Sequence, residues 1–279
     1  MKWKAWIFVG ILLLAGFWLF CEIDHGIAPL PGKLRATVIF KRGPAPENTQ
    51  GIYLIVAPDF PPHAINELYH SPNSLPIDQD TVVTEMDLPY GRYEAMCLWW
   101  YGTDIASNLA DVLALPLDIH DNLLPMAFEI TEESPVFEYD LYANWTIVDR
   151  NAAIEGTVTF NGPFPENTAV TAVAAYRYIP EAAVHYLTYL KSIDFSIDDN
   201  ETHTYDYRLP IRNGEINYIC VLWLAEQAAL TDFSTIGFYR DPDNPEEPGS
   251  LRIRADEVAS NITIEADWTL INNPTIELP

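Results

Sequence analysis

Two loops carry side-chain oxygen atoms at close spacing, and such groups are the ligands of a hard cation such as Ca²⁺, which takes about six to eight of them. The later loop has the sequence DPDNPEEP from Asp241 to Pro248, and the earlier loop places His120 among its acids at the matching position. The candidate metal ligands are Asp118, Asp121, Asp241, Asp243, Asn244 and Glu246. No EF-hand or RTX spacing is present, so the simpler interpretation is two solvated turns held by Asx hydrogen bonds. We therefore expect no cofactor, with Ca²⁺ as the alternative.

No set of residues in the sequence predicts catalysis. There is no G-x-S-x-G, no H-E-x-x-H and no Gly-rich phosphate loop, and the histidines are spread singly. A second acidic cluster, from Asp194 to Glu201, fits a solubilising hairpin tip better than a glycosidase pair, which needs two carboxyl groups facing one cleft. We expect no catalytic residues and a protein that is not an enzyme. An envelope hydrolase with a carboxylate pair is the third hypothesis.

Aromatic residues are the other candidates for ligand binding. Trp99, Trp100 and Tyr101 follow one another, and successive side chains of a strand point to opposite faces, so at least one ring must point away from the inner core. Tyr176 and Tyr178 add rings near a predicted helix. Stacked exposed rings suit a carbohydrate or a peptide. The simpler interpretation is that these rings pack between a sheet and its helix or between two domains.

The cysteines predict free thiols and one lipid acceptor. Three cysteines are too few for a disulfide scaffold. Cys97 and Cys220 occupy equivalent places in two apolar segments, so each should lie in its own core, too far apart for a bridge, which requires Cα atoms within about 7 Å. Both are expected to be buried free thiols. Cys21 directly follows an apolar segment and is the candidate lipidation site.

The first 21 residues predict an export signal. Two lysines precede an uncharged apolar segment from Trp6 to Phe20. Cys21, placed after this segment, resembles the acceptor of a bacterial lipoprotein signal, although Phe20 stands where such signals have a small residue. An uncleaved membrane anchor and a soluble secreted form are the alternatives. Residues 22–33 are expected to form a short stalk that tethers the domains to the membrane.

The chain contains the same unit twice. The segment Ala143–Ile147 recurs as Ala266–Leu270, 123 residues later, and this offset holds without a gap back to Cys97. Upstream the offset is 120 and then 119, so the length differences fall in loops, where they cost little. Trp145 and Trp268 lie in the two recurring segments, and we expect them to anchor the cores of two separate units.

Alternation of apolar and polar residues predicts strands. Every second residue is apolar in residues 34–40 and again in residues 154–160. About seven such strands per copy, separated by Pro, Asn and Asp turns, indicate an all-β fold of two tandem antiparallel β-sandwich domains. Residues 61–71 and 180–192 predict a short helical insertion in each copy, covering one sheet edge.

Two segments carry a resemblance to a known family. They are GTVTFNGPFPENTAVTAV, from Gly156 to Val173, and LPYGRYEAMCL, from Leu88 to Leu98. Together they resemble the opening strand, Gly/Pro turn and L-P-x-G-x-Y hairpin of the carboxypeptidase regulatory-like, or transthyretin-like, Ig-like sandwich domains of bacterial envelope proteins. The second copy differs from this pattern by an insertion of Arg212 and Asn213 in its hairpin. The resemblance implies accessory or binding work without catalytic residues.

Charge and organisation together define the expected function. A net charge of −25 excludes nucleic acid as a partner, because phosphates would be repelled. We expect a non-enzymatic protein, tethered to a membrane of the cell envelope by its N-terminus, whose sandwiches act as binding or spacer modules for an envelope protein or a glycan. The alternative is a Ca²⁺-dependent adhesion or glycan-binding module. The predicted parts are a signal or anchor (1–21), a stalk (22–33), a first sandwich (34–148), a linker (149–153), a second sandwich (154–271) and a C-terminal tail (272–279).

Overall fold

The computed structural model describes residues 31–103, 110–118, 124–197, 203–226, 228–229 and 232–272. The predicted signal segment with Cys21, the candidate ligand Asp121 and most of the second acidic cluster lie outside these residues. Within the described ranges, no helix is both long and apolar enough to cross a lipid bilayer.

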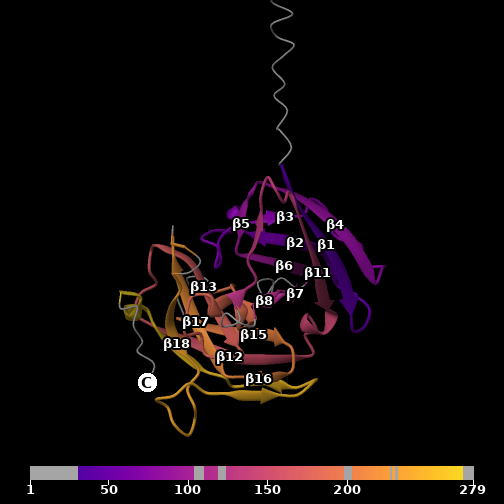
Figure 1. Ribbon diagram of the computed structural model, residues 1–279. Helices are drawn as coiled ribbons and strands as arrows, with labels where there is room; N and C mark the ends of the chain where they lie inside the picture. The colour runs from indigo at the N-terminus through magenta and orange to yellow at the C-terminus, as the bar shows by residue number, and fades with distance from the viewer. Residues whose placement is uncertain are drawn as a thin grey trace, which may run out of the picture.

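The first copy forms two facing sheets, drawn from indigo to magenta in Figure 1. One sheet has the order β11-β1-β4, and the other has the order β3-β2-β6-β7, with two small strand pairs beside them. The strands are β1 (Gly32–Lys41), β2 (Thr49–Ala57), β3 (Tyr69–His70), β4 (Thr81–Leu88), β5 (Gly91–Tyr93), β6 (Ala95–Gly102), β7 (Val112–Ala114), β8 (Leu117–Asp118), β9 (Leu124–Pro125), β10 (Phe128–Ile130) and β11 (Val136–Asn144).

The second copy repeats this arrangement, drawn from rose through orange to yellow in Figure 1. Its sheets have the orders β15-β12-β20, with β21 also paired to β12, and β14-β13-β17-β18. The strands are β12 (Ala152–Asn161), β13 (Thr168–Tyr176), β14 (Leu190–Asp194), β15 (Thr204–Ile211), β16 (Gly214–Ile216), β17 (Tyr218–Ala225), β18 (Ser234–Phe238), β19 (Leu251–Ile253), β20 (Val258–Ala259) and β21 (Ile264–Asp267). The predicted all-β fold of two tandem sandwiches is confirmed.

The closing strand of each copy runs parallel to the first strand, a pairing that the prediction of antiparallel sandwiches does not include. β11 pairs with β1 in parallel, with Val38 opposite Leu141, and β21 pairs with β12 in the same way. Parallel neighbours cannot be joined by a tight hairpin and need a long connection. Here that connection is the rest of the sandwich, which passes through the opposite sheet before the chain returns.

Trp145 and Trp268 directly follow the closing strands, and each begins a short 3₁₀ helix, η3 (Trp145–Ile147) or η4 (Trp268–Asn272). The Oδ1 atom of Asn144 accepts a hydrogen bond of 3.1 Å from the backbone N–H of Thr146, which caps η3. Asp267 does the same for Thr269 at 2.8 Å. Both indoles are buried, and each stacks on a phenyl ring of its own first strand at centroid distances of 5.1 and 4.7 Å.

Irregular features are duplicated along with the strands. The pairing of β2 with β6 shifts register between Thr49 and Gly51, and the pairing of β13 with β17 shifts at the equivalent point after Thr168. The Nε1 atom of Trp100 donates a 2.9 Å hydrogen bond to the hydroxyl of Thr49, and Trp223 donates one of the same length to Thr168. Each of these buried indoles therefore has a partner for its N–H group.

The insertions between β2 and β3 and between β13 and β14 contain less helix than predicted. The first contains a 3₁₀ turn, η1 (Ile65–Glu67), and the second a single α-helical turn, α2 (His185–Thr188). Ile55 faces His70 across β2 and β3, whereas Ala174 faces Ile193 across β13 and β14. The offset between the copies thus rises from 119 to 123 here, so the second insertion is longer.

The predicted insertion of Arg212 and Asn213 in the second hairpin is wrong. Leu88 pairs with Gly32 in the first copy, and Ile211 pairs with Ala152 in the second, so Ile211 is the equivalent of Leu88. The Leu-Pro pair of the second copy, Leu209 and Pro210, lies two residues earlier in the strand and is equivalent to Met86 and Asp87 of the first copy. Both hairpins have the same length.

Candidate functional site: an open aromatic sheet face

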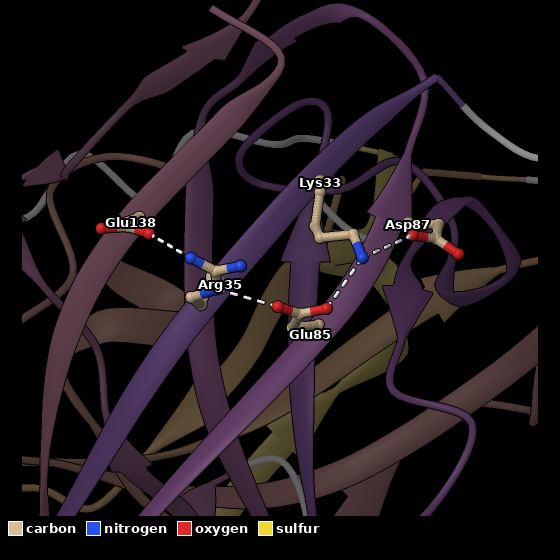
Figure 2. Close-up of polar contacts among 5 residues, drawn as sticks. All are labelled: Lys33, Arg35, Glu85, Asp87 and Glu138. Carbon is tan, nitrogen blue, oxygen red and sulfur yellow. Dashed lines mark hydrogen bonds and ion pairs between the residues drawn. The ribbon is translucent and has the colours of Figure 1, made fainter.

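A network of charged side chains lies on the outer face of the β11-β1-β4 sheet (Figure 2). Arg35 donates hydrogen bonds to Glu85 at 2.8 Å and to Glu138 at 2.6 Å. Lys33 donates to the other oxygen of Glu85 at 2.7 Å and lies 3.8 Å from Asp87. Hydrogen bonds from Lys33 and Arg35 hold the pKa of Glu85 below its usual range. The network thus joins three strands across one exposed surface.

Comparison of the two copies indicates that this network is structural. The equivalents of Arg35 and Glu85 are Glu155 and Arg208, which also form an ion pair, with the signs reversed. A site that recognises a ligand by charge would need one sign at each position. What both copies share is the attraction between strands, which favours one strand register.

The three consecutive rings of β6 point to both faces of their sheet. Trp100 points inward and is buried in the first core. Trp99 and Tyr101 point outward, where both are partly exposed. Tyr53 of β2 pairs with Trp99, so the outward face carries three neighbouring rings, with centroids 6.4 Å apart for Tyr53 and Trp99 and 5.8 Å apart for Trp99 and Tyr101. The prediction from sequence included Trp99 and Tyr101 but missed Tyr53.

The remaining side chains of this open face are apolar or weakly polar. Ile55 and Cys97 continue the two central strands, and His70 lies opposite Ile55 on β3. Ile55, Cys97 and the three rings are partly exposed, and His70 is exposed. We call the surface made by Tyr53, Ile55, His70, Cys97, Trp99 and Tyr101 the open face.

The equivalent face of the second copy is closed. The equivalents of Tyr53 and Ile55 are alanines, those of Trp99 and Tyr101 are leucines, and those of His70 and Cys97 are an isoleucine and a cysteine. None of these six residues is more than 4 % exposed: Ala172, Ala174, Ile193, Cys220, Leu222 and Leu224. The same sheet surface is therefore buried in one copy and accessible in the other.

The longer insertion of the second copy helps to close its face. Tyr186 and Tyr189, in and next to α2, pack with Phe233 against the face, and Ala110 of the first copy also contacts it. Tyr176 belongs to this cluster and is 1 % exposed, so it cannot stack on a ligand. Tyr178 lies outside it, 47 % exposed, with the Arg177 guanidinium 5.0 Å from its ring centre. The predicted stacking residues are thus divided between several surfaces.

The two cysteines are free thiols in equivalent strand positions, as expected. Cys220 is buried, but the expectation that Cys97 is also buried is wrong, because its side chain lies on the open face and is partly exposed. Burial raises the pKa of Cys97 to about 12 and raises that of Cys220 further. A thiol must ionise to act as a nucleophile, so neither sulfur is activated at neutral pH.

The later acidic loop forms a hydrogen-bonded turn. The backbone N–H of Asp243 donates to Oδ1 of Asp241 at 2.8 Å, and Arg240 donates to the carbonyl of Pro245 at 2.7 Å. In the first copy, Asp118 lies at the end of β8, opposite Leu124. Within the described ranges, no three His, Cys, Asp or Glu residues gather in a way that could hold a metal ion. The expectation of no cofactor and the alternative of Ca²⁺ binding both stay predictions for solution experiments.

No family model matches the chain, and no curated protein matches it significantly. Solved structures with similar parts include a leucine-rich repeat protein from Bacteroides thetaiotaomicron (9 % identity, TM-score 0.31), of which the chain covers only 26 % while 85 % of the chain is covered. A candidate cell adhesion protein from Bacteroides eggerthii matches with 11 % identity and a TM-score of 0.25, over 90 % of each chain. A streptococcal ancillary pilin matches with 12 % identity and a TM-score of 0.22, over 84 % of this chain and 62 % of the pilin. At these scores the similarities carry no argument about function.

Proposed function

We propose that the chain is a non-enzymatic, membrane-tethered protein of the cell envelope, in which the first sandwich binds a carbohydrate through its open face and the second acts as a spacer. The supporting observation is the unequal cover of two equivalent sheet faces. Where the closed face has Ala172 and Leu222, the open face has Tyr53 and Trp99. A group of neighbouring apolar side chains left accessible on a surface indicates an interaction site, whereas single exposed apolar side chains are common and need no explanation.

Carbohydrate is the ligand that suits these rings best. The planes of Tyr53 and Trp99 are inclined by 38°, and those of Trp99 and Tyr101 by 40°. Tyr53 lies across the strands from Trp99, and Tyr101 lies along the same strand, so the three rings form one cluster on which the apolar faces of pyranose units can stack. The phenol groups and the imidazole of His70 add polar groups that can hydrogen-bond sugar hydroxyls.

Tethering and lack of catalysis belong to the same proposal. The apolar segment before Cys21 motivates the tether, and the unactivated thiols and scattered carboxylates motivate a protein without enzymatic activity. Kinship with carboxypeptidase regulatory-like domains would fit this role. Mass spectrometry of the mature protein tests the tether: a diacylglyceryl group on Cys21 supports a lipoprotein, and an unmodified N-terminus after cleavage would contradict tethering.

Glycan binding is tested with a glycan array followed by titration of the best ligand. We expect Trp99→Ala and Tyr53→Ala to weaken binding about tenfold or more, which corresponds to about 1.4 kcal/mol. Tyr142→Ala is the matched control, because Tyr142 is 60 % exposed on the other sheet of the same sandwich and should not affect binding. Absence of any glycan ligand, or equal binding by the Trp99 variant, would overturn the carbohydrate assignment. Hydrolysis of a bound glycan would overturn the non-enzymatic one.

A further inference from the structure

Three cations without an acidic partner lie at one edge of the second sandwich. They are Arg177, directly after β13, Lys191 in β14, and Arg212, directly after β15. Among the described residues, no acid forms an ion pair with any of the three. Acidic residues outnumber basic residues by 40 to 15, so an unpaired group of cations is not what the composition predicts. We call these three residues the cationic cluster.

Strand pairing brings the first two side chains together. Tyr176 ends β13 and faces Leu190 of β14. The backbone N–H of Arg177 donates a 3.0 Å hydrogen bond to the carbonyl of Tyr189. Arg177 and Lys191 are therefore diagonal neighbours on adjacent strands, a separation that long side chains can span.

Arg212 reaches the same edge from the other sheet. The hydroxyl of Ser192 donates a 2.8 Å hydrogen bond to the carbonyl of Pro210, which joins β14 to β15. Arg212 follows Pro210 by two residues, so it lies beside the first residues of β14, which include Lys191. Both sheets of the second sandwich thus contribute to the cationic cluster.

Lys191 is partly buried and has like charges near it. Burial is the main cause that lowers the pKa of Lys191, followed by the charges of Arg177 and Arg212. Arg150 of the linker has a smaller effect, and it already forms an ion pair with Asp111 of the first sandwich. Like charges without a counter-charge repel one another and destabilise the fold. An anion bound between them would remove this repulsion.

The first copy shows that the fold does not require these cations. Strand register identifies the equivalent residues of the first copy, all of them uncharged: Pro58, Leu68 and Pro89. A charge that stabilised the sandwich itself would be expected in both copies, as is the case for the ion pair of Glu155 with Arg208. The cationic cluster is specific to the second copy, which indicates a role in binding.

We propose that the cationic cluster binds a compact, doubly charged oxyanion, namely phosphate or sulfate. Guanidinium and ammonium groups are the usual protein ligands of such anions. The ligand is small, because a net charge of −25 repels a long polyanion from the rest of the surface. A free phosphate ion and the phosphate group of a small ester offer the same chemistry. The inference does not depend on carbohydrate binding at the open face.

Isothermal titration at low ionic strength tests the proposal. The probes are inorganic phosphate and glycerol 3-phosphate, and glycerol is the uncharged control. We expect both phosphates to bind in a saturable way, glycerol not to bind, and added salt to weaken binding because it screens the charges. Tighter binding of inorganic phosphate would identify the free ion as the source, and tighter binding of glycerol 3-phosphate would identify an ester.

Two variants test the residues of the cluster. Lys191→Leu introduces the residue of the first copy, and Arg212→Gln removes a second cation. Each should weaken phosphate binding about tenfold or more, because a hydrogen bond between charged groups is lost. Arg92→Gln is the matched control: it changes the net charge by the same amount at an exposed residue of the first sandwich and should bind phosphate as the wild type does.

Thermal unfolding separates loss of binding from loss of the fold. Phosphate should raise the melting temperature of the wild type, because it binds only the folded chain. Lys191→Leu should unfold at a temperature no lower than the wild type without phosphate, because it removes a partly buried charge, and phosphate should not stabilise it. Trp99→Ala should bind phosphate normally, so that failure of this site is distinguished from failure of the open face.

Two results would overturn the proposal. One is the absence of saturable phosphate binding at concentrations up to about 10 mM. The other is equal phosphate binding by Lys191→Leu and Arg92→Gln, because the anion would then be attracted by overall charge and not by the cationic cluster.

Discussion

At the scale of single residues, the two copies show which positions depend on packing. Gly156 of the second copy is equivalent to Ala36 of the first copy. A Cβ atom on Gly156 would lie 1.8 Å from the carbonyl oxygen of Ile262, because the chain between β20 and β21 enters the core there. That oxygen also accepts a 2.8 Å hydrogen bond from the hydroxyl of Tyr207 and is held in place.

Gly156→Ala should therefore lower the free energy of unfolding by about 3 kcal/mol, the upper part of the range for overpacking a core. The neighbour is backbone and cannot rotate away. Ala36→Gly is the matched control, and it should cost only about 0.5–1 kcal/mol through the greater freedom of the unfolded chain. Urea unfolding measures both variants, and equal losses would contradict the close approach.

Two acidic groups with raised pKa values, the buried Tyr93 and the partly exposed Cys97, predict a loss of stability at high pH. Burial raises the pKa values of Cys97 and Tyr93 to about 12, above the ordinary values of about 8.5 and 10 for unfolded chains. Between these limits the unfolded chain loses protons that the folded chain keeps, so the free energy of unfolding falls by about 1.4 kcal/mol per pH unit and group. Full stability is expected below about pH 8.5, with a decline toward pH 12.

Urea unfolding between about pH 8 and pH 11 tests this dependence. Cys97→Ala removes one of the titrating groups, so its stability should decline less steeply than that of the wild type. Tyr142→Ala, which changes an exposed ring, should decline as the wild type does. If Cys97→Ala and the wild type decline in parallel, the thiol is not protected from ionisation by the fold.

At the scale of strands, pattern alone predicts alternation but not direction. The apolar residues of β1 and β12 alternate as expected, and Leu34, Val38, Ile154 and Val158 are completely buried. Parallel pairing of the closing strand could not be predicted, because direction depends on the end from which the chain returns and not on the residues of the strand. The sequence aligns the hairpin of the second copy wrongly for a related reason. A Leu-Pro pair occurs in both copies, and only the strand register shows that Ile211, not Leu209, is the equivalent of Leu88.

The reversed ion pair provides a test at this scale. Glu155→Arg and Arg208→Glu should each lower stability by up to about 1 kcal/mol, because like charges then face each other across β12 and β15. The double variant restores an attractive pair with the signs found in the first copy and should recover most of the loss. A double variant as unstable as the sum of the single variants would show that the pair contributes nothing to strand pairing.

At the scale of the whole molecule, the sequence reveals the doubling but not which copy is open. The offset of 123 predicts equivalent strands, and equivalent strands have the same faces. Whether a face is buried depends on what covers it, and here the cover comes from a longer insertion and from Ala110 of the other sandwich. For the same reason Tyr53 was missed as a candidate: within its apolar strand nothing distinguishes an accessible ring from a buried one.

Unequal cover of the two faces is the central claim, and hydroxyl-radical footprinting of the purified protein measures it directly. Tyr53 and Tyr218 have the same intrinsic reactivity and lie on equivalent sheet faces, but Tyr53 is partly exposed and Tyr218 is 3 % exposed. We predict that Tyr53 is oxidised several times faster than Tyr218, with Trp99 also modified. Equal protection of Tyr53 and Tyr218 would contradict the account, because both faces would then be covered.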